Sequence, residues 1–457
     1  MQTPDITGHV LFVNPPSERA LYRGIVCTWV SKARYLWQPF DFILLSALVK
    51  PPMRVSYKDS FLHNVDMRDI IRFARDEQVT YIVMAMSSIE WESDKAALLS
   101  LRNELPKVNI AVLGDIFQER CFVKQVLPLG VTIIRHPLDL KIAEYFSSGN
   151  TRAPALLCGL NTEEKRLPPV NIPRSVEFPL PRHEVFLNTR HRSPFDKYRH
   201  SAIVNITWGC PFSCSYCSWS SPYLPFVHKS AASVIKELET LNRRGVREIF
   251  FSDLSFGFPG DIVREVIEAM LQNNWRFSWH CYIKSGSLSE DFLRAMRKSG
   301  CHTVITGVES SNLNLSRYNR NVSLEDIRKT IALCHSLGID ICGDFILGLN
   351  DSSDNWRELA QFAIDLNLDF ASFNIYTPLL GSLERYRKIE EGTIKEGECG
   401  FDTTGCKRSL VEHSENRSKC VRKFYGRPAY WLKRLSKLKT LDECLIKLEE
   451  AANLFIK

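Results

Sequence analysis

Apolar runs alternate with helix-like stretches along most of the 457-residue chain. Five apolar runs precede a proline-rich segment, and six more follow it. Strands that alternate with helices form βαβ units, in which the strands lie parallel within one sheet. The sequence therefore predicts an α/β protein with one parallel sheet on each side of the break, and a chain of this length has room for two or three domains.

Residues 1–150 are predicted to form an open, doubly wound, Rossmann-like domain. Its expected strands are residues 9–13, 54–57, 80–84, 109–113 and 131–134. Open parallel sheets bind ligands beyond the carboxyl ends of their strands. Asn14, Ser87, Ser88 and Gly114 fall at such ends, and we expect a ligand crevice there.

The rest of the chain divides into three further regions. Residues 151–195 are rich in proline, which interrupts helices and ladders, and are predicted to be a linker. Residues 196–385 are predicted to form a partial (β/α)6 barrel with its site at the carboxyl ends of the strands. The expected barrel strands are residues 202–208, 248–252, 277–283, 303–308, 339–347 and 370–376.

Residues 386–457 are basic and are predicted to be a small helical region that includes a helix over 440–456. Basic and aromatic side chains together are also found on helices that rest on a membrane surface. Packing of this region against its own domain is the favoured interpretation, because most amphipathic helices of globular proteins pack in that way.

Three cysteines follow the first expected barrel strand in the pattern C-x3-C-x2-C. They are Cys210, Cys214 and Cys217. Three thiolates in one tight loop hold three irons of a four-iron cluster and leave the fourth iron open to a substrate. The alternative is three loop cysteines without a cluster, which the spacing and the preceding strand disfavour.

The cysteine content, the first residues and the net charge limit the class of protein. The chain has 14 cysteines, but its first residues lack a charged region followed by a long apolar run, so no signal peptide is expected. Iron thiolates need a reducing compartment, and we expect a cytoplasmic protein whose other cysteines are reduced. The net charge of +7 is mild and does not predict a nucleic-acid partner.

The cysteine loop resembles the signature of the radical S-adenosylmethionine (SAM) enzymes. The resemblance implies a 4Fe-4S cluster on Cys210, Cys214 and Cys217, SAM bound to the open iron, and a 5′-deoxyadenosyl radical formed by its reductive cleavage. It also implies a small-molecule substrate and an electron donor such as flavodoxin or ferredoxin. The partial barrel is the architecture of this family.

Further segments resemble the parts of that family that contact SAM. By this resemblance Tyr216 lies beside the cofactor, and Asp253, at the end of the second barrel strand, binds its amino group. Glu309 and Ser310 match a G-x-E-S segment that meets the ribose hydroxyls.

Ile346 and Gly348 match the segment beside the adenine. Cys399, Cys406 and Cys420 are interpreted as ordinary thiols rather than ligands of an auxiliary cluster, because their spacing is wide and irregular.

The amino-terminal region resembles the cobalamin-binding-type domain that precedes the radical core in one subgroup. This implies cobalamin as a further cofactor, with Asn14, Ser87, Ser88 and Gly114 as its expected contacts. The D-x-H-x-x-G loop of cobalamin-dependent mutases is altered here, since Phe61 takes the histidine position. No imidazole is therefore expected under the cobalt.

Three interpretations of the function follow from these resemblances. The first is a cobalamin-dependent methyltransferase that acts on an unactivated carbon or a phosphinate centre in a biosynthetic pathway. The second is a radical enzyme that carries out cyclisation, rearrangement or oxidation without methyl transfer. The third is a radical SAM enzyme whose first domain has lost cobalamin and acts as a docking or substrate-lid module.

Overall fold

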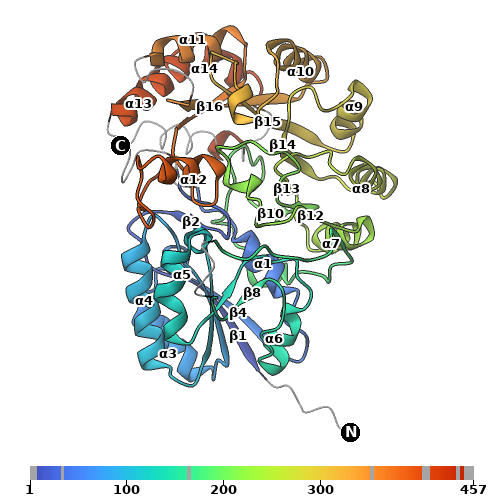
Figure 1. The fold of residues 1–457 in the computed structure, drawn as a ribbon. Helices are drawn as coiled ribbons and strands as arrows, with labels where there is room; N and C mark the ends of the chain where they lie inside the picture. Colours follow the sequence, from blue (N-terminus) through green and yellow to red (C-terminus); the bar gives the residue numbers. More distant parts are fainter. Residues whose placement is uncertain are drawn as a thin grey trace.

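A computed structural model describes residues 8–31, 35–161, 166–349, 355–403, 412–438 and 443–446. Two six-stranded sheets dominate the structure, one above the other in Figure 1. The predicted α/β class is confirmed. The helix expected over 440–456 lies mostly outside the described residues.

The amino-terminal sheet has the order β4-β1-β5-β6-β7-β8, in which only β8 is antiparallel to its neighbour. Its strands are β1 (His9–Asn14), β4 (Arg54–Asp59), β5 (Tyr81–Ala85), β6 (Asn109–Leu113), β7 (Thr132–Ile134) and β8 (Leu156–Leu157). The strand order reverses between β1 and β5, which is where a doubly wound sheet opens its crevice. Because β8 belongs to this sheet, the sheet continues past residue 150.

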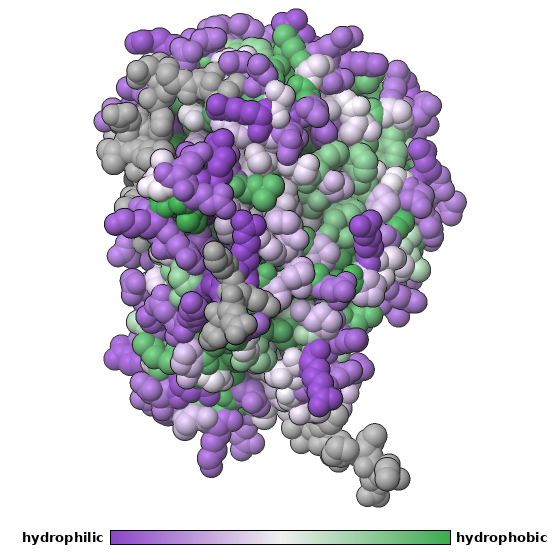
Figure 2. Space-filling model, in the orientation of Figure 1, coloured by the Kyte–Doolittle hydropathy of each residue, from purple (hydrophilic) through white to green (hydrophobic). Residues whose placement is uncertain are grey.

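Side chains of β1 alternate between two hydrophobic cores, as the pleat of a strand requires. Val10 and Phe12 pack on one face, and Leu11 and Val13 pack on the other. Helices cover both faces (Figure 1), namely α1 (Phe40–Ser46), α3 (Met67–Asp76), α4 (Trp91–Glu104), α5 (Arg120–Val126) and α6 (Ile142–Ser148). Figure 2 shows hydrophilic side chains spread over the outer helices of both domains on the face drawn.

The second sheet is an open barrel of six parallel strands in chain order. They are β10 (Ser201–Val204), β13 (Glu248–Phe251), β14 (Ser278–Ile283), β15 (Cys301–Glu309), β16 (Asp340–Leu347) and β17 (Phe370–Ile375). The outer helices are α7 (Ala231–Arg243), α8 (Gly260–Gln272), α9 (Glu290–Lys298), α10 (Leu324–Ser336) and α11 (Trp356–Asp365). Serine side chains cap α7, α9 and α10, which explains where these helices begin.

Both edges of the barrel sheet are covered by side chains from other parts of the chain. On β10, the Gln38 amide donates to the Ser201 carbonyl (2.8 Å) and accepts from the Ile203 backbone N–H (2.9 Å). On β17, the Tyr425 hydroxyl accepts from the Ala371 N–H (3.0 Å) and donates to its carbonyl (2.8 Å). An exposed edge is a template for aggregation, and these bonds block it.

The carboxyl-terminal helices α12 (Leu383–Glu390), α13 (Glu412–Tyr425) and α14 (Pro428–Leu435) pack on the barrel. Phe424, Tyr425 and Tyr430 are buried in the barrel core. None of the described helices is long and apolar enough to cross a bilayer. These contacts show how the region packs on its own domain.

A buried ion pair joins the two domains. The guanidinium of Arg385, in α12, donates to both carboxylate oxygens of Glu119, and both side chains are almost fully buried. The same guanidinium donates to the carbonyls of Pro378 (3.2 Å) and Glu398 (2.7 Å), and the Gly397 N–H donates to Glu119 (3.0 Å). The pair therefore fixes the barrel end to the amino-terminal sheet.

Replacing Arg385 with Met is expected to lower stability, because removal of one partner of a buried pair leaves an uncompensated charge and costs about 3–5 kcal/mol. Differential scanning calorimetry measures the thermal midpoint. The control Arg294→Met breaks an exposed pair with Glu290, which is worth about 0–1 kcal/mol. Equal midpoints for the two variants would show that the Arg385–Glu119 pair does not hold the domains together.

Candidate active site

The three cysteines lie in one loop at the carboxyl-terminal side of the barrel, between β11 (Thr207–Trp208) and a short 3-10 helix, η4 (Ser218–Ser220). β11 pairs with β12 (Val227–Lys229), which anchors the start of the loop. Within the loop, Ser215 donates its backbone N–H to the Tyr318 carbonyl (2.9 Å) and accepts from the Glu384 N–H (2.8 Å). Its backbone is therefore fixed from two sides.

The thiols sit in a buried setting. Burial raises the pKa of Cys217 to about 12, and the neighbouring thiols of Cys210 and Cys214 add to the shift. Cys214 is buried, while Cys210 and Cys217 are half-buried. A bound metal ion instead lowers the pKa of its thiol ligands, since metal ligation requires the thiolate form. Three converging soft ligands fit an iron–sulfur cluster.

Glu309 lies close to this loop at the end of β15. Its carboxylate contacts the Arg320 guanidinium (3.2 Å) and accepts a hydrogen bond from Tyr216. Burial raises the pKa of Glu309, and Arg320 acts against that rise. The residue has φ of 71°, a conformation that non-glycine residues rarely adopt and that is concentrated at functional sites. Arg320 also contacts Cys214, and so it links the predicted SAM residue to the cysteine loop.

Most of the residues predicted to contact SAM gather here. Tyr216 and Ile346 pack against one apolar cluster that contains Tyr318, and Ser310 follows Glu309 directly. Gly348 follows β16 with φ of +78°. Arg320 was not predicted, because it lies 11 positions beyond Glu309 in a loop without a recognisable motif.

Asp253 follows β13, and the structure shows its contacts within the protein. Its fully buried carboxylate accepts from the backbone N–H groups of Ile206 (3.0 Å) and Thr207 (2.6 Å) and from the Thr207 hydroxyl (2.7 Å). These bonds hold the turn that leads into the cysteine loop. Asp253 is therefore a positioning residue for the loop.

The positions predicted for cobalamin are engaged with their own neighbours. A hairpin of β2 (Leu21–Arg23) and β3 (Thr28–Val30) follows β1. Its buried Arg23 donates to the Asn14 side-chain oxygen (2.7 Å) and pairs with Asp94 (2.8 Å). The Ser87 hydroxyl donates to Asp94 (3.0 Å).

The Ser88 hydroxyl donates to Asp115 (2.7 Å), and a Cβ on Gly114 would lie 2.0 Å from the Met86 carbonyl oxygen. A cavity of about 30 Å³ borders Asn14. Three of the four predicted positions are thus hydrogen-bonded within the domain, and the fourth lies against the backbone of Met86.

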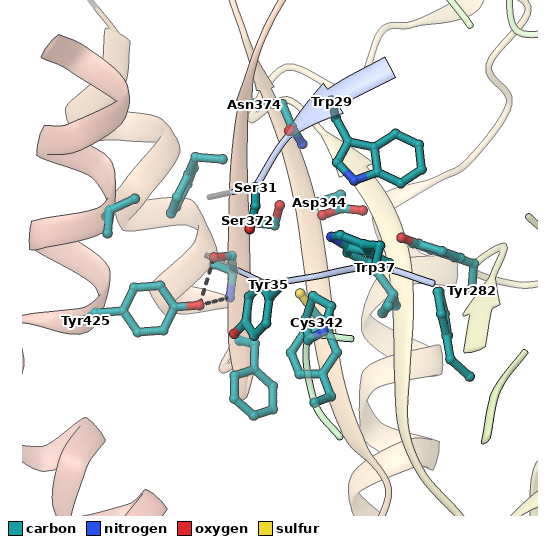
Figure 3. Close-up of a pocket in the computed structure, with 18 of the residues that line it drawn as sticks. Trp29, Ser31, Tyr35, Trp37, Tyr282, Cys342, Asp344, Ser372, Asn374 and Tyr425 are labelled. Carbon is teal, nitrogen blue, oxygen red and sulfur yellow. Dashed lines mark hydrogen bonds between the residues drawn. The ribbon is translucent and has the colours of Figure 1, made fainter. Parts of the chain in front are cut away.

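A cavity of about 970 Å³ fills the barrel interior and reaches the amino-terminal domain. Trp219, two residues after Cys217, lines it, and so do Ser252 and Leu254 on either side of Asp253. The hairpin and the segment after it supply further lining side chains, which are Trp29, Val30, Ser31, Tyr35, Trp37 and Phe40. Figure 3 shows several of them facing barrel residues across the space. Both domains therefore build the chamber beside the cysteine loop.

Two other cysteines considered for an auxiliary cluster lie apart. Cys399 packs against the core of the amino-terminal domain, whereas Cys420 is buried in the barrel core and donates to the Trp356 carbonyl (3.3 Å). Cys406 lies outside the described residues.

Residues 204–363 match the family model described as the radical SAM superfamily. The cysteine loop, Glu309 and Ile346 all lie within this match, and the chain therefore contains a radical SAM domain. The cofactors of such a domain are a 4Fe-4S cluster and SAM.

Relatives and solved structures extend the comparison to the whole chain. The chain is 24% identical to "Uncharacterized methyltransferase PH0819" of Pyrococcus horikoshii, over 93% of this chain and 94% of that protein. It is 26% identical to bacteriochlorophyllide d C-12(1)-methyltransferase of Chlorobaculum tepidum over 43% of this chain and 44% of that protein.

The fold is similar to that of TsrM from Kitasatospora setae, a radical SAM methyltransferase solved with cobalamin and a [4Fe-4S] cluster bound. The TM-score is 0.61 at 17% identity, covering 82% of this chain and 77% of TsrM. This confirms the predicted fold class.

Replacing Cys210, Cys214 and Cys217 together with Ala is expected to abolish cluster binding, because no thiolate of the loop remains to hold iron. Iron content and 5′-deoxyadenosine formation after anaerobic reconstitution measure the loss. The control is Cys158→Ala, which removes an exposed thiol of the amino-terminal domain. Full iron loading and turnover in the triple variant would refute the assignment of this loop.

Proposed function

We propose that this chain is a radical SAM methyltransferase that transfers a methyl group to a carbon centre of a small molecule. The observation that carries the proposal is the cysteine loop of a radical SAM domain beside a chamber of about 970 Å³. The names of the P. horikoshii and C. tepidum relatives support methyl transfer. An unactivated carbon is the substrate centre that needs a radical, and a phosphinate centre is the alternative.

The protein's own part in this reaction is to hold the reactants and exclude water. Aromatic side chains around the chamber keep a carbon radical away from solvent. The cluster needs an electron from outside, for which a flavodoxin or ferredoxin is the proposed donor. Iron–thiolate chemistry needs a reducing compartment, which supports the proposed cytoplasmic location.

We further propose that Tyr216, Asp253, Glu309, Ser310, Ile346 and Gly348 bind SAM. Tyr216 belongs to the cysteine loop, Asp253 follows β13, and the other four lie at the carboxyl ends of β15 and β16. The Glu309 carboxylate suits the two ribose hydroxyls, since an ionised carboxylate accepts from both. Arg320 supports the ionised form because it lies within 3.2 Å of that carboxylate.

Glu309→Gln is expected to weaken SAM binding about ten- to a hundredfold, because a hydrogen bond to a charged group contributes about 1.5–3 kcal/mol. Equilibrium binding of SAM to the oxidised, cluster-loaded protein measures the change, and iron content is expected to stay intact. Glu325→Gln, at an exposed position on α10, is the control. Unchanged affinity in Glu309→Gln would remove this residue from the site.

Cobalamin is proposed to bind at the carboxyl ends of the amino-terminal strands, with Asn14, Ser87, Ser88 and Gly114 as its expected contacts. Bound cobalamin supplies a transferable methyl group. His63 has no free ring lone pair for cobalt. Its Nδ1 accepts from the Asp59 backbone N–H (2.9 Å), and Nε2 then carries the proton of the neutral ring. Burial lowers the pKa of His63, which favours that neutral ring.

The electron paramagnetic resonance spectrum of the cob(II)alamin-loaded protein is expected to lack the splitting that an axial nitrogen adds to the cobalt lines. His63→Ala is expected to leave the spectrum unchanged. A splitting that disappears in this variant would show that His63 binds cobalt.

A second candidate function is a radical SAM enzyme whose first domain only walls the chamber. The engaged side chains at Asn14, Ser87 and Ser88 favour it. If this second function is correct, protein purified anaerobically with excess cobalamin contains no cobalt. The product then has the mass of a cyclised, rearranged or oxidised substrate, and not the mass of the substrate plus one CH₂. Stoichiometric cobalt and that mass gain favour methyl transfer.

A further inference from the structure

The large chamber has two chemically different faces. One face is a continuous wall of aromatic rings that crosses from the hairpin to the barrel. The ring centroids of Trp29 and Trp37 lie 5.6 Å apart, those of Trp37 and Phe250 lie 5.7 Å apart, and those of Phe250 and Tyr282 lie 5.7 Å apart. A planar apolar molecule gains both burial and ring contacts on such a wall.

A second, polar part of the lining comes from the last two barrel strands. Asp344 of β16 and Ser372 of β17 are register partners, and Asn374 follows two residues later on the same side of β17. All three line the chamber, and Figure 3 shows them near Ser31 of the hairpin segment. The face thus combines one carboxylate with hydroxyl and amide groups.

Asp344 lies near the aromatic wall. Burial raises the pKa of the Tyr282 hydroxyl, and the negative charge of Asp344 adds to that rise. A carboxylate accepts hydrogen bonds and cannot donate them when ionised. It therefore favours a ligand that brings a donor, and aromatic rings nearby favour a cation in the same place.

Two arginines line the chamber at the end formed by the carboxyl-terminal helices, but both are engaged with the protein. The Arg434 guanidinium pairs with Asp340 (2.8 Å), and Arg417 donates from Nε to the Phe373 carbonyl (2.9 Å). These bonds hold both guanidinium groups on the protein, and they therefore do not favour an anionic ligand.

We propose that the chamber binds a planar, largely apolar substrate that carries an ammonium or hydroxyl group, which donates to Asp344 while the apolar body lies against Trp29, Trp37 and Tyr282. The inference rests on the proposed function for its use as a substrate site. The carboxylate selects the donor group, and the aromatic wall selects the planar body.

Three matched probes test this inference, namely 2-naphthylmethylamine, 2-naphthylmethanol and 2-naphthoic acid. They share one planar body and differ in the polar group. Isothermal titration calorimetry is carried out on cluster-loaded protein with saturating SAM and no reductant, so that SAM occupies its own site and is not cleaved. The amine and the alcohol are expected to bind at least about tenfold more tightly than the acid.

Asp344→Asn is expected to remove most of the preference for the amine over the acid, because the charge is lost at nearly constant shape. Asp365→Asn, at an exposed position at the end of α11, is expected to leave the order unchanged. Trp37→Leu is expected to weaken all three probes while preserving their order, which separates the wall from the carboxylate. The difference between amine and alcohol shows which donor the site prefers.

The inference is overturned if the acid binds as tightly as the other two probes, if Asp344→Asn leaves the order intact, or if no probe binds. The binding assay needs no catalysis. If the probes bind in the predicted order but no methyl group is transferred, only the proposed function is contradicted.

Discussion

An open barrel leaves two strand edges unpaired, and the rest of this structure depends on how those edges are covered. Gln38 covers β10 from the amino-terminal domain, and Tyr425 covers β17 from the carboxyl-terminal region. Each edge contact draws a neighbouring region against the barrel. The same regions also line the chamber, since Trp37 and Phe40 flank Gln38 and Tyr425 is itself a lining residue. The residues that cover the strand edges therefore lie in or beside the chamber lining.

The spacing of residues along the sequence and their local periodicity explain which features could be predicted. The strand–helix alternation identified both sheets, because a buried parallel strand is apolar along its whole length. The expected strand at 109–113 coincides with β6, and β1 extends one residue beyond its prediction. The cysteine loop was also accessible, because its three ligands are close in sequence and their chemistry depends on that spacing.

Long-range partners explain what could not be predicted. The sequence did not indicate that the Asp253 carboxylate accepts from the backbone N–H groups of Ile206 and Thr207, more than 40 residues away. It also did not indicate that Arg23 of the hairpin donates to Asn14 and pairs with Asp94. Arg320 reaches Glu309 from a loop with no motif. None of these pairings leaves a periodic trace in the sequence.

The hairpin β2–β3 and the segment after it give the chamber an unusual origin. Radical formation depends on residues of the barrel, whereas much of the aromatic wall comes from a short stretch of the first domain that holds no cluster ligand. Changes in that stretch alter the shape of the chamber without touching the residues that hold iron. Substitutions in the hairpin and the segment after it therefore change which molecules fit the chamber while the cysteine loop stays the same.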